Sequence, residues 1–261
     1  TTPFSYVATT SAILWEHFTP VYVDIDPDNF CIDVDKIEAA ITSRTRAILA
    51  VHVFGFHCNM EKIESIAKKY NLKVIYDGAH AFGAKYKGRS LLDYGDISIC
   101  SFHATKLFHT IEGGCIITKD PNINKKIDIM KRFGHNGDQH LSLGINAKAS
   151  EFQAAMGLCN LKYIDVLIQK RKVVSKLYDD LLSDEYSTFS LDNDSEYNYA
   201  YYPIIFKYED DLIKTISSLK KINIHPRRYF YPSLNTIPYV AGKKCPRSEE
   251  HTSEHDSICS G

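Results

Sequence analysis

The feature that most constrains the fold of this chain is an alternation of short apolar runs with amphipathic segments in its first half. Runs typical of buried strands occupy residues 47–54, 72–76, 97–102 and 115–118. Between the first two, residues 60–70 carry apolar side chains at helical spacing and lysines on the opposite face. Strands joined through a helix pair in parallel, because the chain must cross one face of the sheet to return. The pattern therefore predicts an α/β fold with a mainly parallel sheet covered by helices.

The residues before this region predict less regular structure. The chain starts at Thr1 without a Met, in a stretch that has extended character, so we expect further sequence to precede it. Residues 21–26, VYVDID, predict a short strand, and residues 35–42 have helical spacing.

The second half predicts a smaller unit. Residues 149–182 read as a long helical region, and an aromatic-rich strand is expected at 199–206. We therefore predict a large domain over 1–165 and part of a small α+β domain over 166–242.

The last nineteen residues, 243–261, differ from the rest of the chain. They contain one large aliphatic residue, Ile258, among mostly polar and charged residues. Such a composition buries too little apolar surface to order itself. The string SEEHTSE also resembles read-through of technical sequence. We expect this tail to be disordered or non-native, which makes the chain truncated at both ends.

Composition excludes several classes of protein. The formal net charge is -1, which argues against a nucleic-acid-binding or membrane-surface protein that relies on bulk charge. No apolar run is long enough to span a membrane, and no secretory signal is present. Seven scattered cysteines without a CxxC pair indicate reduced thiols rather than disulfides or a zinc site. These features predict a cytoplasmic protein without a metal site.

Polar side chains follow the predicted strands where ligands collect in open α/β sheets. Asp77 ends the apolar run 72–76, and Lys106 follows the run 97–102. Alone, Asp77 is most simply a helix cap or turn residue, and Lys106 a surface lysine. Together they suit pyridoxal phosphate, which needs a Schiff-base lysine and an acid facing its pyridinium nitrogen. The GxGxxG motif is absent, which weighs against a nicotinamide enzyme.

Seven stretches of the chain carry a resemblance to a known family. They are TTPFSYVATTSAI, PVYVDIDPDNFCID, VHVFGFHCNMEKIESIA, VIYDGAHAFGAKYKG, SFHATKLFHTIEGG, LGINAKASEFQAAMGL and HPRRYFYP. In this order they resemble the DegT/DnrJ/EryC1/StrS family of sugar aminotransferases. The resemblance implies the fold type I of PLP-dependent transferases, of the aspartate-aminotransferase kind, and a homodimer with active sites at its interface. SFHATK followed by EGG looks most like enzymes that aminate C4 of a dTDP-4-keto-6-deoxyhexose.

The resemblance also implies roles for individual residues. Lys106 matches the lysine that binds the cofactor covalently and moves protons. Asp77 matches the acid that faces the pyridine nitrogen, and His80 the position that hydrogen-bonds the phenolic oxygen. The remaining matches are the ring-stacking Tyr6, the phosphate-binding Ser101 and Asn146, which reaches the neighbouring subunit's site. The family also has a Gly-Thr phosphate-binding segment, which would precede Thr1.

The implied reaction leaves alternatives open. The donor expected from the resemblance is glutamate, and the acceptor is a nucleotide-linked keto sugar. The same fold could aminate C3 of the sugar. A dehydratase of the same family lacks the Schiff-base lysine, so Lys106 argues against it. A non-enzymatic protein that binds PLP or a nucleotide sugar is the alternative from another class.

Overall fold

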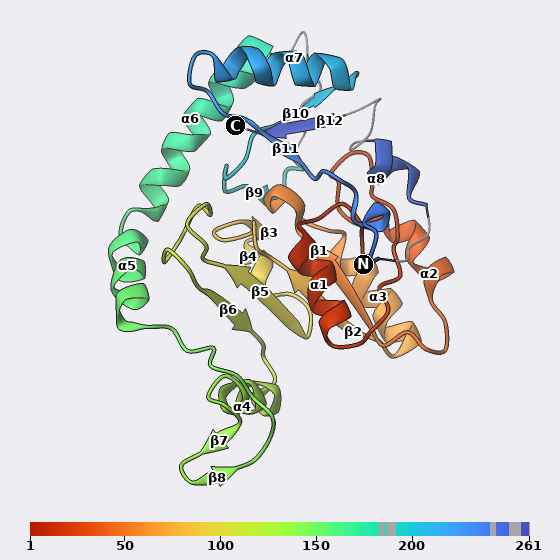
Figure 1. The fold of residues 1–261 in the computed structure, drawn as a ribbon, viewed down its shortest axis with the longest axis vertical. Helices are drawn as coiled ribbons and strands as arrows, with labels where there is room; N and C mark the ends of the chain where they lie inside the picture. Colours follow the sequence, from red (N-terminus) through yellow and green to blue (C-terminus); the bar gives the residue numbers. More distant parts are fainter. Residues whose placement is uncertain (183–185, 187–191, 241–243, 251–256, 261) are drawn as a thin grey trace.

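A four-stranded sheet forms the centre of the molecule in the computed structural model, which describes residues 1–182, 186, 192–240, 244–250 and 257–260 (Figure 1). Its order is β1-β2-β5-β6. The first three strands run in parallel, and β6 pairs antiparallel with β5. The predicted mainly parallel α/β sheet is therefore confirmed. Its strands are β1 (Ala47–Val51), β2 (Lys73–Asp77), β5 (Ile97–Ser101) and β6 (Gly114–Ile117).

The crossover between β1 and β2 is the helix α3 (Met60–Tyr70), as the sequence predicts. The side chain of Asn59 caps its start by accepting the backbone N–H of Lys62. Asn71 ends it in the left-handed conformation. The apolar face of α3 is buried, including Ile63 and Ile66, and packs on β1 and β2. This unit fixes β2, and with it the position of Asp77.

Three segments before the first strand differ from expectation. Residues 7–15 form the helix α1 (Val7–Trp15) instead of continuing an extended stretch. Residues 21–26 form no strand, because their only ladder contact is an isolated bridge between Ile25 and Ile32. The expected helix over 35–42 is present in shorter form, as η1 (Val34–Lys36) followed by α2 (Ile37–Ala40).

The first strand is also shorter than predicted. β1 ends at Val51, and the short helix η2 (Val53–Gly55) follows. Phe54 within it has a φ of 55°, in the left-handed region. This turn reverses the chain where a continued strand was expected, and it places Phe54 in the core with no exposed surface.

Aromatic side chains from three distant segments meet in the core. Phe4, Phe54 and Phe230 pack with ring centroids 5.2 to 6.4 Å apart. Phe30 lies 5.5 Å from Phe4. The N-terminal segment and the region around residue 230 are thus held against the sheet by one cluster.

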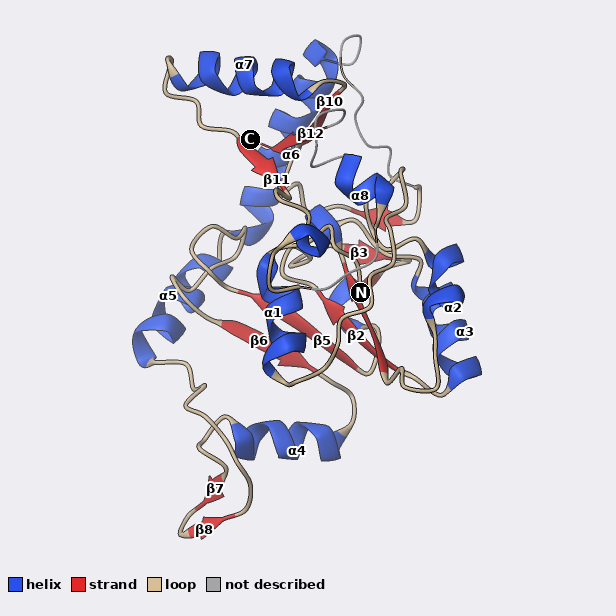
Figure 2. Ribbon diagram, turned by 45° about the vertical axis from the view of Figure 1, so that its right-hand side comes forward, coloured by secondary structure: helices blue, strands red, loops and turns tan. Residues whose placement is uncertain are grey.

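The remaining elements form an arm and a second small sheet. Figures 1 and 2 show the arm, made of α4 and the β7–β8 hairpin, at one end of the molecule and α7 with its strands at the opposite end. The arm and the helices after it are α4 (Pro121–Met130), β7 (His135–Asn136), β8 (Gln139–His140), α5 (Glu151–Leu161) and α6 (Ile164–Leu182). No described helix is long and apolar enough to cross a membrane.

The small sheet has the order β10-β12-β11 and lies near α7. A third sheet, β4-β3-β9, joins the two halves of the chain. The predicted boundary at residue 165 falls at the start of α6, and the division into two domains stays a prediction. The elements not yet bounded are β3 (Lys85–Tyr86), β4 (Arg89–Ser90), η3 (Leu91–Asp93), β9 (Ser195–Glu196), β10 (Pro203–Phe206), α7 (Glu209–Lys220), β11 (Arg227–Tyr229), η4 (Leu234–Thr236), α8 (Pro246–Glu250) and β12 (Ser257–Ser260).

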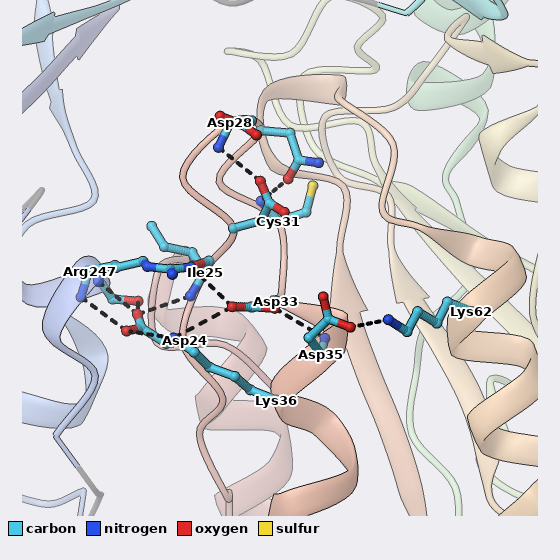
Figure 3. A network of polar contacts seen from close by, with 12 residues as sticks. Asp24, Ile25, Asp28, Cys31, Asp33, Asp35, Lys36, Lys62 and Arg247 are labelled. Atoms are coloured by element: carbon cyan, nitrogen blue, oxygen red, sulfur yellow. Dashed lines mark hydrogen bonds and ion pairs between the residues drawn. The ribbon is translucent and has the colours of Figure 1, made fainter.

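Part of the C-terminal tail is packed, contrary to expectation. Asp24 accepts hydrogen bonds from the backbone N–H groups of Arg247 and Ser248 at 3.0 and 2.9 Å (Figure 3). Burial opposes ionisation of Asp24, but these donors hold its pKa below the usual range. Arg247 also pairs with Asp33 at 3.0 Å. The expectation of a disordered tail is therefore wrong for residues 245–249 and for 257–260, whose strand β12 pairs with β10 and β11, while 243, 251–256 and 261 lie outside the described residues.

Candidate active site

The carboxyl ends of β2 and β5 lie side by side, as parallel pairing requires. Asp77 is the last residue of β2 and Ser101 the last of β5. The backbone N–H of Gly78 donates to the carbonyl of Ile99 at 2.8 Å, which joins the two strand ends. A Cβ at Gly78 would lie 2.9 Å from that same carbonyl oxygen, so the close approach requires glycine. Asp77 and Ser101, which the sequence places in separate apolar runs, therefore lie at the same edge of the sheet.

Asp77 is held by a set of hydrogen-bond donors. Its side chain is buried, and its Oδ2 accepts the hydroxyl of Thr9 at 2.7 Å. Its Oδ1 accepts the backbone N–H of Ala79 at 3.0 Å. The hydroxyl of Ser5 lies 2.8 Å from that of Thr9. Sequence reasoning missed Ser5 and Thr9, because α1 was expected to be extended and Thr9 precedes Asp77 by 68 residues.

Lys106 lies in the turn after β5. Its backbone N–H donates to the carbonyl of His103 at 2.9 Å. Burial lowers the pKa of the Lys106 amine, although the carboxylate of Asp77 opposes this shift. Asp77 ends β2 beside β5, and Lys106 follows Ser101, the last residue of β5. A lowered pKa increases the fraction of neutral, nucleophilic amine.

His80 is held in one tautomer. It is buried, and its Nδ1 accepts the backbone N–H of Phe54 at 3.0 Å. Burial, and secondarily the charge of Lys106, lowers the pKa of His80 well below 6.5, so the imidazole is neutral. A neutral imidazole whose Nδ1 accepts must carry its proton on Nε2. His80 therefore offers one fixed N–H donor.

The loop that carries His80 is fixed by a residue far along the chain. The side-chain amide of Asn198 donates to the carbonyls of His80 and Phe82 at 2.8 and 2.9 Å. Tyr201 packs its ring 4.4 Å from that of His80. Gly55 makes room for this contact, since a Cβ there would lie 2.8 Å from the His80 carbonyl oxygen. No local pattern in the sequence marks Asn198 or Tyr201.

Three other predicted residues are placed differently. Ser101 is partly buried and accepts a long hydrogen bond, 3.4 Å, from the backbone N–H of His103. Tyr6, 66% exposed, directly precedes α1 and is adjacent to Ser5. Asn146 is not brought to the strand ends, because its segment forms a bridge with Arg132 after α4. Its Oδ1 accepts Lys148 Nζ at 2.6 Å.

A second cation missed by the sequence reasoning stands near the lysine. Arg227 on β11 is exposed, and its charge acts on both Lys106 and Tyr201. It shares a strand face with Tyr229, whose ring lies 5.8 Å from that of Tyr201. Arg228 faces the other way and pairs with Glu209 at 2.5 Å.

Two further histidines, His52 and His57, make contacts of a structural kind. His52 is fully buried and stacks on Tyr76 with ring centroids 4.7 Å apart. His57 pairs with Asp192 at 2.9 Å. Within the described part of the chain, no group of three His, Cys, Asp or Glu side chains is arranged to hold a metal ion.

Comparison with known proteins gives a consistent result. Residues 1–260 match the DegT/DnrJ/EryC1/StrS aminotransferase family. A dTDP-4-amino-4,6-dideoxy-D-glucose transaminase of Escherichia coli is 42% identical over 250 residues, which are 93% of this chain and 67% of that protein. A dTDP-3-amino-3,6-dideoxy-alpha-D-galactopyranose transaminase of Aneurinibacillus thermoaerophilus is 40% identical over 67% of this chain and 48% of its own. The chain thus spans about two thirds, or less, of these relatives.

Solved structures share the fold. The crystal structure of DesI in the presence of its TDP-sugar product matches 99% of this chain and 68% of its own, with a TM-score of 0.90 and 30% identity. Helicobacter pylori PseC, an aminotransferase involved in pseudoaminic acid biosynthesis, matches 99% of this chain and 73% of its own at a TM-score of 0.90 and 27% identity. The predicted fold type I is confirmed.

Proposed function

The chain belongs to the DegT/DnrJ/EryC1/StrS aminotransferase family, and we propose that it acts as a PLP-dependent transaminase on C4 of dTDP-4-keto-6-deoxyglucose. The observation that supports the chemistry is that Asp77 ends β2 beside the end of β5, which Lys106 follows, and that His80 lies in the turn after Asp77. The C4 position is supported by the similarity to the Escherichia coli C4 transaminase over 93% of the chain. The similarity to the C3 transaminase of Aneurinibacillus thermoaerophilus keeps C3 amination as the second candidate.

The donor set fits pyridoxal phosphate. The cofactor needs an amine, a carboxylate for the ring nitrogen and a donor for its phenolic oxygen. The half-buried amine of Lys106, the buried carboxylate of Asp77 and the Nε2–H of His80 are those groups. We assign ring stacking to Tyr6 and phosphate binding to Ser101, whose hydroxyl is at the end of β5.

The residues divide the work of the reaction between them. When bound, pyridoxal phosphate supplies an electron sink for the charge that develops at the amino-acid Cα. Lys106 would hold the cofactor, and its Nζ, when free as an amine, would accept the proton from the amino-acid Cα. Asp77 keeps a positive charge on the ring nitrogen, which strengthens the sink. His80 holds the ring from its phenolic edge.

Both proposed substrates are anions, and Arg227 is suited to bind one of them. Glutamate carries carboxylates, and a nucleotide sugar carries a diphosphate. Arg227 is exposed, lies near Lys106 and shares a strand face with Tyr229. A guanidinium binds either group with paired hydrogen bonds. We assign Arg227 to an anionic group of a substrate.

The proposed assembly is a homodimer with Asn146 near the partner's site. The segment before Asn146 and the helices α5 and α6 expose large apolar side chains that a monomer would leave in water. The most exposed are Leu143 at 91%, Phe152 at 86%, Val173 at 71%, Leu181 at 69% and Ile145 at 67%. A second copy would cover them and bring Asn146 to the interface. Every cysteine side chain that the structure describes is free, which supports a cytoplasmic location.

One experiment tests the proposed function directly. The protein is incubated with PLP, glutamate and a panel of dTDP-, UDP- and GDP-linked keto sugars, and the new amine is located by NMR. We expect amination of dTDP-4-keto-6-deoxyglucose at C4. A product with its amine on C3 would replace the first candidate by the second. PLP binding without any amino sugar product would support a binding protein instead.

A further inference from the structure

Two hydroxyl groups form a chain that ends on the carboxylate of Asp77. Ser5 Oγ lies 2.8 Å from Thr9 Oγ1, and Thr9 Oγ1 lies 2.7 Å from Asp77 Oδ2. All three side chains are buried, with exposed fractions of 3%, 4% and 7%. Two buried hydroxyls and a carboxylate in contact are an uncommon use of the first turn of a helix, where α1 begins at Val7.

The chemistry of the three groups fixes the direction of donation. An ionised carboxylate only accepts hydrogen bonds, so the single proton of the Thr9 hydroxyl points to Asp77. Thr9 then has only lone pairs left for Ser5, and Ser5 must be the donor between them. The chain therefore runs from Ser5 through Thr9 to Asp77, and each link polarises the next.

The other oxygen of Asp77 is also held, by the N–H of Ala79 at 3.0 Å. Both oxygens thus have a donor from the protein, and the carboxylate plane is fixed. Each donor holds one carboxylate oxygen in place. A carboxylate fixed in this way is oriented to accept a charge-assisted hydrogen bond from a cationic partner.

We propose that Thr9, supported by Ser5, is a positioning residue that keeps the proton on the ring nitrogen of the cofactor by fixing and stabilising the Asp77 carboxylate. This proposal rests on the proposed function, because it takes pyridoxal phosphate as the group that Asp77 faces. It goes beyond that function by assigning a role to the N-terminal turn of α1.

The test compares four single variants, Thr9→Val, Thr9→Ser, Thr10→Val and Ser5→Ala, reconstituted with PLP labelled with 15N at the ring nitrogen. Thr9→Val removes the hydroxyl at nearly constant side-chain volume, whereas Thr9→Ser keeps the hydroxyl. Thr10→Val is the matched control, because Thr10 is the next residue of α1 and equally buried, but its hydroxyl bonds Tyr22 at 2.9 Å. The readouts are the 15N chemical shift of the ring nitrogen and the dissociation constant of PLP.

We expect Thr9→Val to move the 15N shift toward that of an unprotonated pyridine and to weaken PLP binding about tenfold, as loss of a charge-assisted hydrogen bond implies. Thr9→Ser and Thr10→Val should both have the wild-type 15N shift and the wild-type dissociation constant of PLP. Ser5→Ala should shift the signal in the same direction by less.

A Thr9→Val protein with the wild-type 15N shift would overturn the proposal, and so would an equal shift in Thr10→Val. These outcomes are independent of turnover. If the wild type binds PLP but makes no amino sugar, the proposed function fails, while the comparison of ring-nitrogen shifts still decides the role of Thr9.

Discussion

At the scale of single residues, Lys106 has a part that no other side chain of the site can take. Replacing Lys106 with Ala or Arg should lower transamination at least about a hundredfold, because Ala has no amine and Arg does not lose its proton. Both variants should also lose the absorbance of lysine-bound PLP near ~420 nm. Lys125→Ala, on the exposed side of α4, is the control and should retain both properties. Wild-type turnover in Lys106→Ala would refute the site.

Two buried histidines predict how stability depends on pH. Burial lowers the pKa of His52 from 6.5 to about 3 and that of His80 well below 6.5. Below about pH 6.5 the unfolded chain therefore binds protons that the folded chain excludes, and the free energy of unfolding falls as the pH falls. Between about pH 7.5 and 5.5 the exclusion of a proton from His52 should lower the free energy of unfolding by about 1.4 kcal/mol, and His80 adds to this loss.

Urea unfolding at these two pH values measures this loss. His52→Gln should remove about 1.4 kcal/mol of this loss, whatever its effect on stability at neutral pH. A free energy of unfolding that is the same at both pH values would show that the imidazoles accept protons in the folded state.

At the scale of elements, Arg227 and Arg228 are neighbours in β11 and lie on opposite faces of the strand. Arg227 lies on the face of Tyr229, toward Lys106, while Arg228 pairs with Glu209 and stacks on Tyr231 at 3.7 Å. Arg227→Gln should therefore raise the KM for an anionic substrate about tenfold or more, as loss of a charged hydrogen bond implies. Arg228→Gln should act mainly on stability.

Separate half-reactions identify the substrate that Arg227 contacts. Loss of affinity in the reaction with glutamate alone assigns the side chain to a carboxylate. Loss only in the reaction with the nucleotide sugar assigns it to the diphosphate. Unchanged KM values in both would remove Arg227 from the site.

The elements also show what a sequence pattern can and cannot predict. The helix over 60–70 is reproduced residue for residue, because its apolar spacing and its Asn59 cap are both local. The segment 21–26 has a strand-like composition but lacks a partner beyond one bridge at Ile25, and pairing is not a local property. Asn198 was missed for the same reason. It lies beside no recognisable motif, and the His80 carbonyl that it hydrogen-bonds is 118 residues away in the sequence.

In the predicted site, too, some residues could be inferred from the sequence and others could not. Asp77 and Lys106 could be inferred because parallel strands bring their carboxyl ends to one edge whatever the loops do. Ser5 and Thr9 could not, because their contact depends on where α1 begins. The backbone topology is therefore readable from the sequence, while the support of the catalytic groups is not.

At the scale of the whole molecule, the exposed apolar side chains predict association. Leu143 and Phe152 are 91% and 86% exposed on the proposed interface. Burying such a side chain stabilises a complex by about 1.5–3 kcal/mol, so Leu143→Asp with Phe152→Asp should weaken a dimer at least about a hundredfold. Light scattering over a concentration series measures this. Ile213→Asp on α7, at the other end of the molecule, is the control.

A wild-type protein that is monomeric at all concentrations would contradict the proposed dimer. A double variant that remains dimeric would place the interface elsewhere on the surface. Either outcome would also remove the role proposed for Asn146.

The contact between Asn198 and the His80 loop has a consequence for the order in which the protein matures. The ribosome delivers His80 long before Asn198, and the two carbonyls that Asn198 holds have no substitute among the described contacts. A nascent chain can therefore form the β1–α3–β2 unit early, while the loop that holds the cofactor's phenolic edge stays unformed. Contacts across so many residues close slowly. We therefore expect the loop that carries His80 to become ordered only after Asn198 has been synthesised.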